Sequence, residues 1–542
     1  MPLFLSAEQK SVKGIFLNDD IYIIPYYQRP YSWTEEHCLQ LYNDITQSFE
    51  EDRPYFVGNI IFAQQEGKEE LEIIDGQQRL ITLWLFIKAM SVIYPKLSKI
   101  KRLISVIPSW DEETEPVCKF NSKIIETEDQ ESLDRILLFT QNDFETEHQT
   151  YRSRGWERYS KENRNIVANA IAVYGMLWEF FEEDEGAKWE DFWEFLSNQV
   201  YLLPIILSDK ELIDARNKAL TIFETINNRG MDLQDADIFK AKLYDMAQRA
   251  NEEDSFINRW QEITSVCREL NLTTDDLFRY YYQIIRGENR VLLREKGLRD
   301  FFFSDNMSPF KTGDYRVIVR GLTDTLCAVE KLIIKEDEHT NLAKWLQVLS
   351  AYTNQYPRYA LVAYYYFYRD ASDDEAINLV QKLIRYVYSK GATSTVKFEI
   401  YSIISSIAHQ EDIKEYFHDV DEDMINNPGR LTNGLSLLYY HLKVRNSEFL
   451  RPYKVEKLLK GIDQRSRTWD GQKYSSLANY AILPSTLSNK PIIDRLSKYQ
   501  ELDYYCEYLS PYLSNDDYTE NEFEQRRQDI KAVLNLFFGR NE

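Results

Sequence analysis

The sequence predicts an α+β protein, with a small sheet near the N-terminus and helices over most of the remaining chain. Short segments rich in Ile, Val and Phe stand within the first 75 residues, which is typical of strands. From residue 77 the apolar positions recur at helical spacing, and a mostly helical pattern continues from about residue 100 to 440. The charge pattern then changes again, so we expect three domains, over residues 1–250, 251–440 and 441–542.

Three strands and a helix are expected in order along the N-terminal segment. The strands are predicted over residues 21–24, 56–62 and 71–74. Residues 65–68 are expected to form a hairpin turn between the second and third strands. A helix is predicted to begin just after Gly76. Its apolar positions recur at helical spacing: Leu80, Leu83, Trp84 and Ile87.

The composition fits a globular protein and excludes several other classes. The 542 residues are 44% apolar and 28% charged, and the 18 Gly and 15 Pro are too few for a collagen-like or low-complexity chain. The five Cys form no CxxC pair, which speaks against a zinc ribbon or a disulfide framework and favours a reducing compartment. The strongest apolar run, residues 80–87, is too short to span a bilayer, and the first residues lack the pattern of a signal peptide. We therefore expect a cytoplasmic protein with no membrane partner.

The net charge of −23 works against nonspecific DNA affinity, which needs Lys and Arg to displace counterions. One stretch differs, because nine basic and four acidic residues between positions 443 and 473 give it a local charge of +5. The breaker Asn427-Pro428-Gly429 precedes it and lies close to the expected domain boundary after residue 440. The stretch is a candidate DNA contact, and a solvated surface without a ligand is the alternative. The candidate DNA-binding residues are Lys454, Lys457, Lys460, Arg465 and Arg467.

The segment Asp75-Gly76-Gln77-Gln78-Arg79 carries the main functional argument, because it joins the end of a strand to the start of a helix. Free N–H groups and the helix dipole at that point favour a phosphate, and Gly76 lets the backbone approach an anion closely. Arg79 can donate two hydrogen bonds to phosphate oxygens, and Asp75 can hold Mg²⁺ or position a water. The amides of Gln77 and Gln78 can bind a nucleotide or the attacking water. The alternative is structural: Asp75 caps the helix and pairs with Arg79 four residues later.

Two further segments combine polar and aromatic residues in a way that suggests a site. Residues 24–33 place Gln28 and Arg29 among large aromatic side chains in one turn region. A helix is expected to end at Asn227-Asn228-Arg229-Gly230, with Gly230 as its cap, and a second helix follows with Asp237 and Lys240. The structural alternatives are an aromatic core corner for the first segment and a solvated helix–turn–helix for the second.

Together and in this order, the three segments resemble the N-terminal domain of the GmrSD-type modification-dependent restriction endonucleases, a family with a DGQQR motif. The resemblance covers about residues 10–245. The matching residues are Pro25, Tyr27, Gln28, Arg29, Tyr31 and Trp33, then Tyr55, Phe56, Gly58 and Ile60, then Asp75 to Leu80 with Thr82 and Leu83, and finally Phe223, Glu224, Asn227, Arg229, Gly230, Leu233, Asp237, Lys240 and Leu243.

The resemblance implies a ParB/sulfiredoxin-like α/β core with a helical extension, and a role in bacterial defence against phage. It also implies a nucleoside triphosphate (NTP) and Mg²⁺ as cofactors, with NTP hydrolysis at the DGQQR motif and a part in sensing modified DNA for the same region. Carried onto this chain, it makes Asp75, Gln77, Gln78 and Arg79 the expected catalytic residues, with Asp75 as the metal ligand. The expected nucleotide-binding residues are Gln28, Arg29, Gly76, Asn227, Arg229, Asp237 and Lys240.

The C-terminal segment resembles, in degenerate form, the HNH-type nuclease domain that usually accompanies this family. Residues 453–459 are similar to the first part of the HNH pattern and residues 477–492 to the second, which includes Asn479 and Asn489. Lys457 stands where the water-activating His is expected, and residues 442–542 contain no His. A lysine stays charged at neutral pH and accepts no proton. We therefore expect cleavage to belong to a separately encoded nuclease subunit.

The leading hypothesis is an antiphage defence protein that binds and hydrolyses an NTP to control DNA targeting or a nuclease partner. One alternative is a non-catalytic, nucleotide-switched regulatory subunit. Another is an endonuclease that nicks DNA with the N-terminal domain itself.

Overall fold

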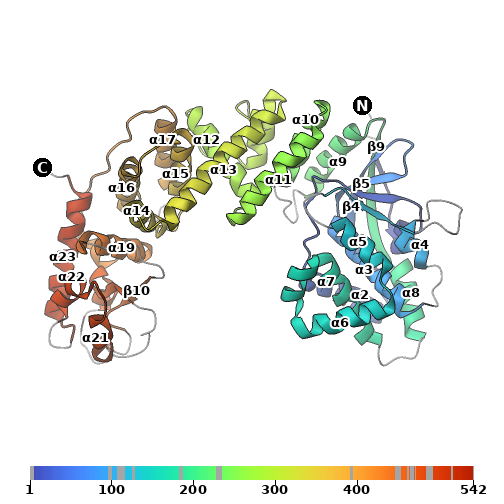
Figure 1. Ribbon diagram of the computed structural model, residues 1–542, viewed down its shortest axis with the longest axis horizontal. Helices are drawn as coiled ribbons and strands as arrows, with labels where there is room; N and C mark the ends of the chain where they lie inside the picture. Colours follow the sequence, from blue (N-terminus) through green and yellow to red (C-terminus); the bar gives the residue numbers. More distant parts are fainter. Residues whose placement is uncertain are drawn as a thin grey trace. The chain divides into compact units, whose positions relative to one another are not determined.

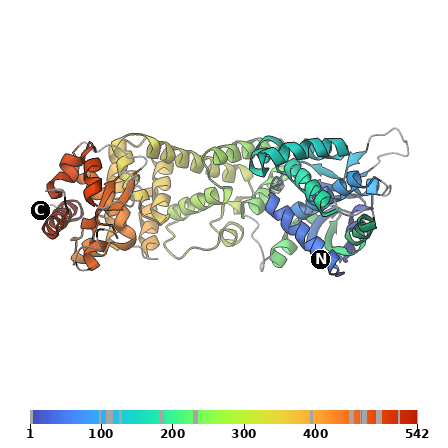
Figure 2. The same cartoon turned by 90° about the horizontal axis from the view of Figure 1, so that it is seen from below.

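The chain divides into two compact units, Met1–Glu253 and Asp254–Glu542. The computed structural model describes residues 5–95, 100–106, 116–124, 129–181, 187–227, 235–390, 395–445, 453–460, 463, 469, 471–483, 492–513 and 517–540. The predicted α+β class is confirmed, because a large mixed sheet lies in the first unit and helices make up most of the second (Figures 1 and 2). The predicted division into three domains stays a prediction.

A mixed seven-stranded sheet forms the centre of the first unit. The strand order is β1-β9-β4-β5-β3-β8, and β2 also pairs with β9. Neighbouring strands are parallel in the pairs β4–β9, β3–β5 and β3–β8, whereas β4 and β5 form an antiparallel hairpin. The strands are β1 (Leu5–Ala7), β2 (Lys10–Ser11), β3 (Ile21–Ile24), β4 (Tyr55–Gln65), β5 (Glu70–Asp75), β8 (Phe120–Ser122) and β9 (Val200–Asp209), with a separate pair β6 (Ser105–Val106) and β7 (Val117–Cys118).

The three predicted strands are confirmed as β3, β4 and β5, and the predicted turn joins the last two. The strand β9 is a correction, since residues 200–209 lay in the region expected to be mostly helical. β9 lies between β1 and β4, where all ten of its residues are buried or half-buried. Its sequence is therefore a nearly continuous apolar run, and such a run does not show the alternation that identifies a half-exposed strand.

Helices cover both faces of this sheet. Ile60 and Phe62 of β4 share a core with helix α3 (Gln77–Ile93), whereas the alternate residues Ile61 and Ala63 are buried outside that core. Helix α9 (Leu212–Asn227) packs on β4, β9 and β5. The other helices of the unit are α1 (Val12–Phe16), α2 (Glu35–Glu50), α4 (Lys101–Ile104), α5 (Asp129–Leu138), α6 (Gln141–Arg154), α7 (Trp156–Phe181), α8 (Ala187–Asn198) and α10 (Asp235–Arg249).

The second unit begins with a helical array that shares one hydrophobic core with the C-terminal segment. Its helices are α11 (Glu253–Glu269), α12 (Thr274–Glu288), η2 (Asp300–Ser304), η3 (Pro309–Thr312), α13 (Tyr315–Asp337), α14 (Asn341–Ser350), α15 (Tyr356–Phe367), α16 (Asp373–Lys390), α17 (Val396–Ala408), α18 (Glu422–Asn426), η4 (Gly429–Leu431) and α19 (Thr432–Lys443). None of the helices in the described ranges combines the length and the apolar composition that a bilayer crossing requires.

The C-terminal segment contains a short antiparallel hairpin among helices. Strand β10 (Lys454–Lys457) pairs with β11 (Tyr480–Leu483), and α21 (Ile492–Gln500) follows β11 in the chain. The remaining elements are η5 (Gly471–Ser475), η6 (Leu477–Asn479), α22 (Tyr505–Tyr508), η8 (Ser510–Tyr512) and α23 (Glu520–Phe538).

Candidate functional site

The DGQQR segment forms the junction predicted from the sequence, with Asp75 at the end of β5 and Gln77 as the first residue of α3. Gly76 is the N-cap of α3 with φ of 90°, and no side chain caps the helix. A Cβ at this position would lie 2.9 Å from Ile60 Cγ1 and 3.3 Å from the carbonyl oxygen of Asn59. Both the positive φ and the close approach to β4 therefore require glycine. The helix begins with amide groups that need an external acceptor.

Arg79 lies in the first turn of α3, beside Asp75 and Gly58. Its Nη2 is 3.3 Å from Asp75 Oδ2, so the ion pair of the structural alternative is present, although Gly76 and not Asp75 is the N-cap. Gly58 leaves space for the guanidinium, because a Cβ there would lie 2.2 Å from Arg79 Nη1. Burial raises the pKa of the Asp75 carboxyl, and the nearby Arg79 and Arg29 oppose that rise. Two cations thus flank one partly buried carboxylate.

The amides of Gln28 and Gln78 hold backbone segments of the motif. Gln28 Nε2 donates to the carbonyl of Ile74 at 2.8 Å. Gln78 Oε1 accepts from the backbone N–H groups of Ser32 and Trp33, at 2.9 and 3.1 Å. These hydrogen bonds tie the turn around residues 28–33 to β5 and α3, which indicates a positioning role for both amides. The predicted catalytic role of Gln78 and nucleotide contact of Gln28 stay predictions.

Gln77 differs from Gln78 in its hydrogen bonding. Its side chain is buried, with only 4% of the residue exposed, and neither amide atom has a hydrogen-bond partner among the described residues. A buried amide without partners is costly, so most such groups in folded proteins are satisfied by a ligand, an ordered water or a protein atom. Gln77 is therefore the residue of the motif whose hydrogen-bonding capacity remains available.

The residues predicted to close the site lie at the ends of α9 and α10. Asn227 is the last residue of α9, and its side chain is outside the described part of the structure, as is Arg229 entirely. Asp237 and Lys240 lie in the first two turns of α10, where Lys240 is buried and Asp237 is half-buried. The nucleotide-binding roles of these four residues stay predictions.

A buried ion-pair network, which the sequence does not predict, connects β5 with helices α9 and α10. Arg216 of α9 donates to both carboxylate oxygens of Glu72 in β5, at 2.6 and 2.9 Å, and to Asp245 Oδ1 of α10 at 2.9 Å. The hydroxyl of Tyr27 donates to the same Glu72 carboxylate. All three charged side chains are almost completely buried. The network therefore joins strand β5, the turn that contains Tyr27, and helices α9 and α10. The sequence signal for it is a glutamate, Glu72, that stands between the apolar residues Leu71 and Ile73.

A second buried network joins the same turn to helix α7. Asn169 Nδ2 donates to the carbonyl of Trp33 at 2.8 Å and to the Tyr31 hydroxyl at 3.2 Å. The indole Nε1 of Trp156 donates to Asn169 Oδ1 at 2.9 Å. The Tyr31 hydroxyl also lies 2.7 Å from Thr82 Oγ1 on α3. The aromatic core corner expected as the structural alternative is thus present, but it is built around a buried amide.

The first unit matches one known protein family. Residues 12–244 match the family model described as GmrSD restriction endonuclease, N-terminal domain. This range agrees with the resemblance over residues 10–245. It supports the assignment of these residues, hereafter the GmrSD-type domain, to a family of restriction-type defence nucleases. The match ends before the second unit begins, so the HNH-like assignment of the C-terminal segment stays a prediction. The ParB-like assignment of the N-terminal core also stays a prediction, because the description of the matched family does not include it. A search of curated proteins finds no match to the chain.

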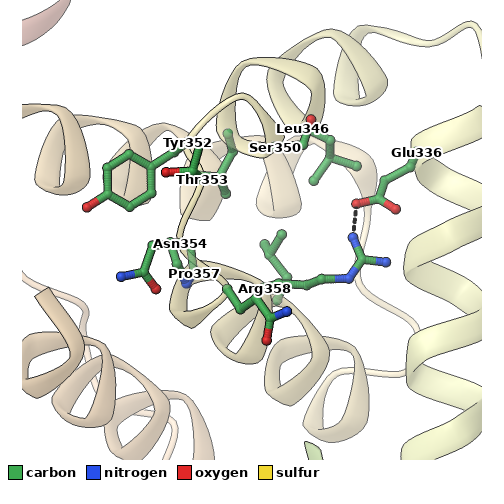
Figure 3. Close-up of a pocket in the computed structure, with 11 residues that line it drawn as sticks. Glu336, Leu346, Ser350, Tyr352, Thr353, Asn354, Pro357 and Arg358 are labelled. Carbon is green, nitrogen blue, oxygen red and sulfur yellow. Dashed lines mark hydrogen bonds and ion pairs between the residues drawn. The ribbon is translucent and has the colours of Figure 1, made fainter. Parts of the chain in front are cut away.

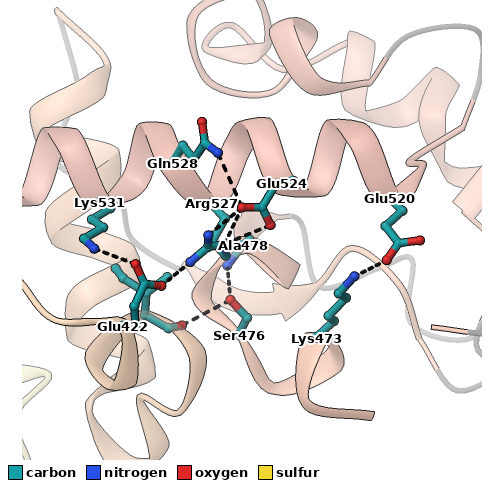
Figure 4. Close-up of polar contacts among 10 residues, drawn as sticks. Glu422, Lys473, Ser476, Ala478, Glu520, Glu524, Arg527, Gln528 and Lys531 are labelled. Carbon is teal, nitrogen blue, oxygen red and sulfur yellow. Dashed lines mark hydrogen bonds and ion pairs between the residues drawn. The ribbon is translucent and has the colours of Figure 1, made fainter. Parts of the chain in front are cut away.

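In the C-terminal segment, side chains of the predicted DNA contact are engaged with neighbouring groups. Lys460 pairs with Glu456, and Lys457 Nζ lies 5.5 Å from the centre of the Tyr480 ring. Lys454 is exposed on β10, whereas Arg465, Arg467 and Asn489 lie outside the described residues. Nearby, Glu520 accepts from Lys473, and Glu422 accepts from Arg527 and Lys531 (Figure 4). Of the basic residues in this stretch, Lys443, Lys460 and Lys473 are thus paired with carboxylates, and DNA binding by the stretch stays a prediction.

Asn479 has a structural role in this segment. Its Oδ1 accepts from the Leu459 N–H at 2.8 Å, and its Nδ2 donates to the Leu459 carbonyl at 3.2 Å. A buried ion pair between Arg495 of α21 and Asp463, at 2.9 Å, fixes the same region. Asn479 therefore holds the chain that follows β10.

A cavity of about 230 Å³ lies in the second unit, at the turn between α14 and α15 (Figure 3). Arg358 donates to Glu336 beside it and to the Tyr280 hydroxyl at 3.1 Å. None of the residues predicted from the sequence lines this cavity.

Proposed function

We propose that the GmrSD-type domain binds and hydrolyses an NTP at the start of α3, and that this reaction controls DNA targeting or a separately encoded nuclease in antiphage defence. The observation that carries the proposal is the position of Arg79, which lies over Gly58 beside the uncapped N-terminus of α3. A guanidinium and free helix amides at one place form a site for phosphate oxygens.

The charges at this place favour an anionic ligand. The ion pair between Asp75 and Arg79 is long at 3.3 Å, and Arg29 adds a second cation near the same carboxylate. A polyphosphate accepts hydrogen bonds from both guanidinium groups and lies near the positive end of α3. Arg79 and Arg29 therefore bind and orient the phosphates.

Asp75 fits the requirements of a Mg²⁺ ligand. Magnesium in nucleotide sites is commonly held by one or two carboxylates together with phosphate oxygens. Asp75 supplies one such carboxylate at the end of β5, beside Arg79. When bound, the ion neutralises phosphate charge, while Gln77 offers an amide donor and acceptor to the nucleotide or to the attacking water.

A binding-only switch is the second candidate function. The Arg216 network links β5 to α9 and α10 through Glu72, which lies on the same strand as Asp75, so a change at the end of β5 can reach both helices along that strand. In this case the NTP binds and changes the state of the protein without turnover.

The test measures NTP binding by calorimetry and phosphate release with Mg²⁺, for the wild type and for Arg79→Ala. Arg53→Ala is the matched control, because Arg53 is an exposed arginine in an ion pair on the same unit. Loss of binding and release in Arg79→Ala alone supports an NTPase. Binding without release supports the switch. Wild-type protein that binds none of the four common NTPs contradicts both.

A further inference from the structure

A group of exposed cations stands at the turn between α6 and α7. Residues 152–164 contain five basic and two acidic residues, in a chain with a net charge of −23. We name this group the basic corner, and its members are Arg152, Arg154, Arg158, Lys161 and Arg164. All five are exposed. The acidic residues of the surrounding chain mask this local cluster in the overall charge.

Carboxylates hold three arginines of the basic corner in place without covering them. Glu162 pairs with both Arg154 and Arg158, so these two guanidinium groups lie side by side. Arg152 pairs with Glu179 further along α7, at 2.6 Å. The side chain of Arg158 nevertheless keeps 73% of its surface exposed. The surface is therefore ordered and still accessible to an anionic partner.

The backbone at the basic corner takes an uncommon conformation. Gly155 and Arg164 bound the first turns of α7, with φ values of 75° and 69°. At Arg164, ψ is 155°, a combination that is normal for glycine and strained for other residues. Such strain persists where the surrounding structure imposes it, and it concentrates at functional positions.

The basic corner is also connected to the site helix. Trp156 is the first residue of α7, and its indole N–H donates to the buried Asn169. Asn169 in turn donates to the carbonyl of Trp33, whose N–H donates to Gln78 of the DGQQR segment. A chain of hydrogen bonds thus runs from the start of α7 to the first turn of α3.

We propose that the basic corner binds the phosphate backbone of duplex DNA, and that the Trp156–Asn169–Trp33 chain makes NTP turnover at α3 sensitive to that binding. The second part rests on the proposed function. Closely spaced arginines can donate hydrogen bonds to successive phosphates of a DNA strand. Such contacts position a protein on DNA without recognising the base sequence. The net charge of −23 disfavours nonspecific binding of DNA, so a local cluster of exposed cations is needed to hold its backbone.

The test of the first part measures the affinity for a fluorescently labelled DNA duplex of about 30 base pairs over a range of salt concentrations. The variant Arg154→Gln/Arg158→Gln/Lys161→Gln removes three cations of the basic corner. The control Arg259→Gln/Arg369→Gln/Lys498→Gln removes three exposed, ion-paired cations of the second unit and changes the net charge equally. We expect affinity to fall by about tenfold or more in the first variant only, with a shallower salt dependence.

Three results overturn the first part: no binding of the duplex by the wild type, equal weakening in both triple variants, or equally tight binding of polyglutamate through the basic corner. The last result would assign the surface to an acidic polypeptide instead of DNA.

Trp156→Phe tests the second part, because it keeps an aromatic ring and removes the indole donor. We expect DNA affinity to stay within about twofold of the wild type and the effect of DNA on phosphate release to disappear. An unchanged DNA effect overturns the connection. If the wild type releases no phosphate with or without DNA, the proposed NTPase fails and this connection with it, while the affinity measurements still decide the DNA surface.

Discussion

The guanidinium of Arg79 occupies the space that a side chain on residue 58 would fill, so that a Cβ at Gly58 would lie 2.2 Å from Arg79 Nη1. Gly58 is on β4 and Arg79 is on α3, so two different elements share the construction of the anion site. The role of the glycine follows from this contact: it keeps the arginine next to Asp75 and the free amides of the helix.

Substitution Gly58→Ala is expected to displace Arg79 and to weaken NTP binding by about tenfold, as measured by calorimetry. Gly67→Ala is the matched control, since Gly67 also has a positive φ but no atom within 4 Å of the added Cβ. Both variants share the backbone penalty of alanine at positive φ. Equal NTP affinity in the two variants would show that Arg79 is not held by Gly58.

The stability of the first unit is expected to depend on pH through Asp75. Burial raises the pKa of Asp75 in the folded state, so between the usual Asp pKa near 3.9 and the raised value the folded state binds more protons than the unfolded state. Stability therefore falls as pH rises through this window. Asp75→Asn should raise the thermal midpoint at neutral pH and flatten its pH dependence above about pH 4. A parallel pH profile in wild type and variant would refute this.

Arg216→Met is expected to destabilise the first unit strongly. It leaves Glu72 and Asp245 buried without their cation, a situation that costs about 3–5 kcal/mol. Chemical unfolding followed by tryptophan fluorescence measures the loss. Arg259→Met, at an exposed ion pair, is the control and should change stability by less than about 0.5 kcal/mol. A small effect at Arg216 would mean that the two carboxylates become protonated at little cost.

Asn479→Ala is expected to loosen the C-terminal segment. The substitution leaves the N–H and carbonyl of Leu459 buried without side-chain partners, at about 1–3 kcal/mol for each unpaired group. Hydrogen exchange of the Leu459 amide should accelerate, whereas Asn427→Ala, which removes only an exposed hydrogen bond to Asp423, should leave that rate unchanged. Unaltered protection of Leu459 in Asn479→Ala would argue against the structural role of Asn479.

The sequence predicts the local elements of the site well, because their signals are local. The strand that ends at Asp75, the glycine that follows it and the helix that begins at Gln77 all lie within a few residues of one another. The strand β9 escaped prediction because burial on both faces removes alternation from its sequence. The range of the family match likewise agrees with the motifs that predicted it.

The partners of the polar side chains could not be predicted in the same way. Gln78 and Trp33 are 45 residues apart, and Arg216 and Glu72 are 144 residues apart. From the sequence, a nucleotide contact is expected for Gln78 because an amide can bind one, and for Gln28 because the family resemblance implies it. In the structure both amides form hydrogen bonds with backbone groups of the protein. Contacts of this kind depend on the folded chain, so the sequence alone does not reveal them.

Helix α3 is enclosed on every side over its first fourteen positions, where Arg79 alone is not buried. A helix in such a setting has little freedom to slide or rotate, since each displacement would open gaps in a close-packed interior. Ligand arrival at its N-terminus will therefore not be relayed by a piston-like motion of the helix. The movable parts are the arginine itself and the segments that contact its surroundings, so any rearrangement on ligand binding will begin in side chains and turns while α3 serves as the fixed frame.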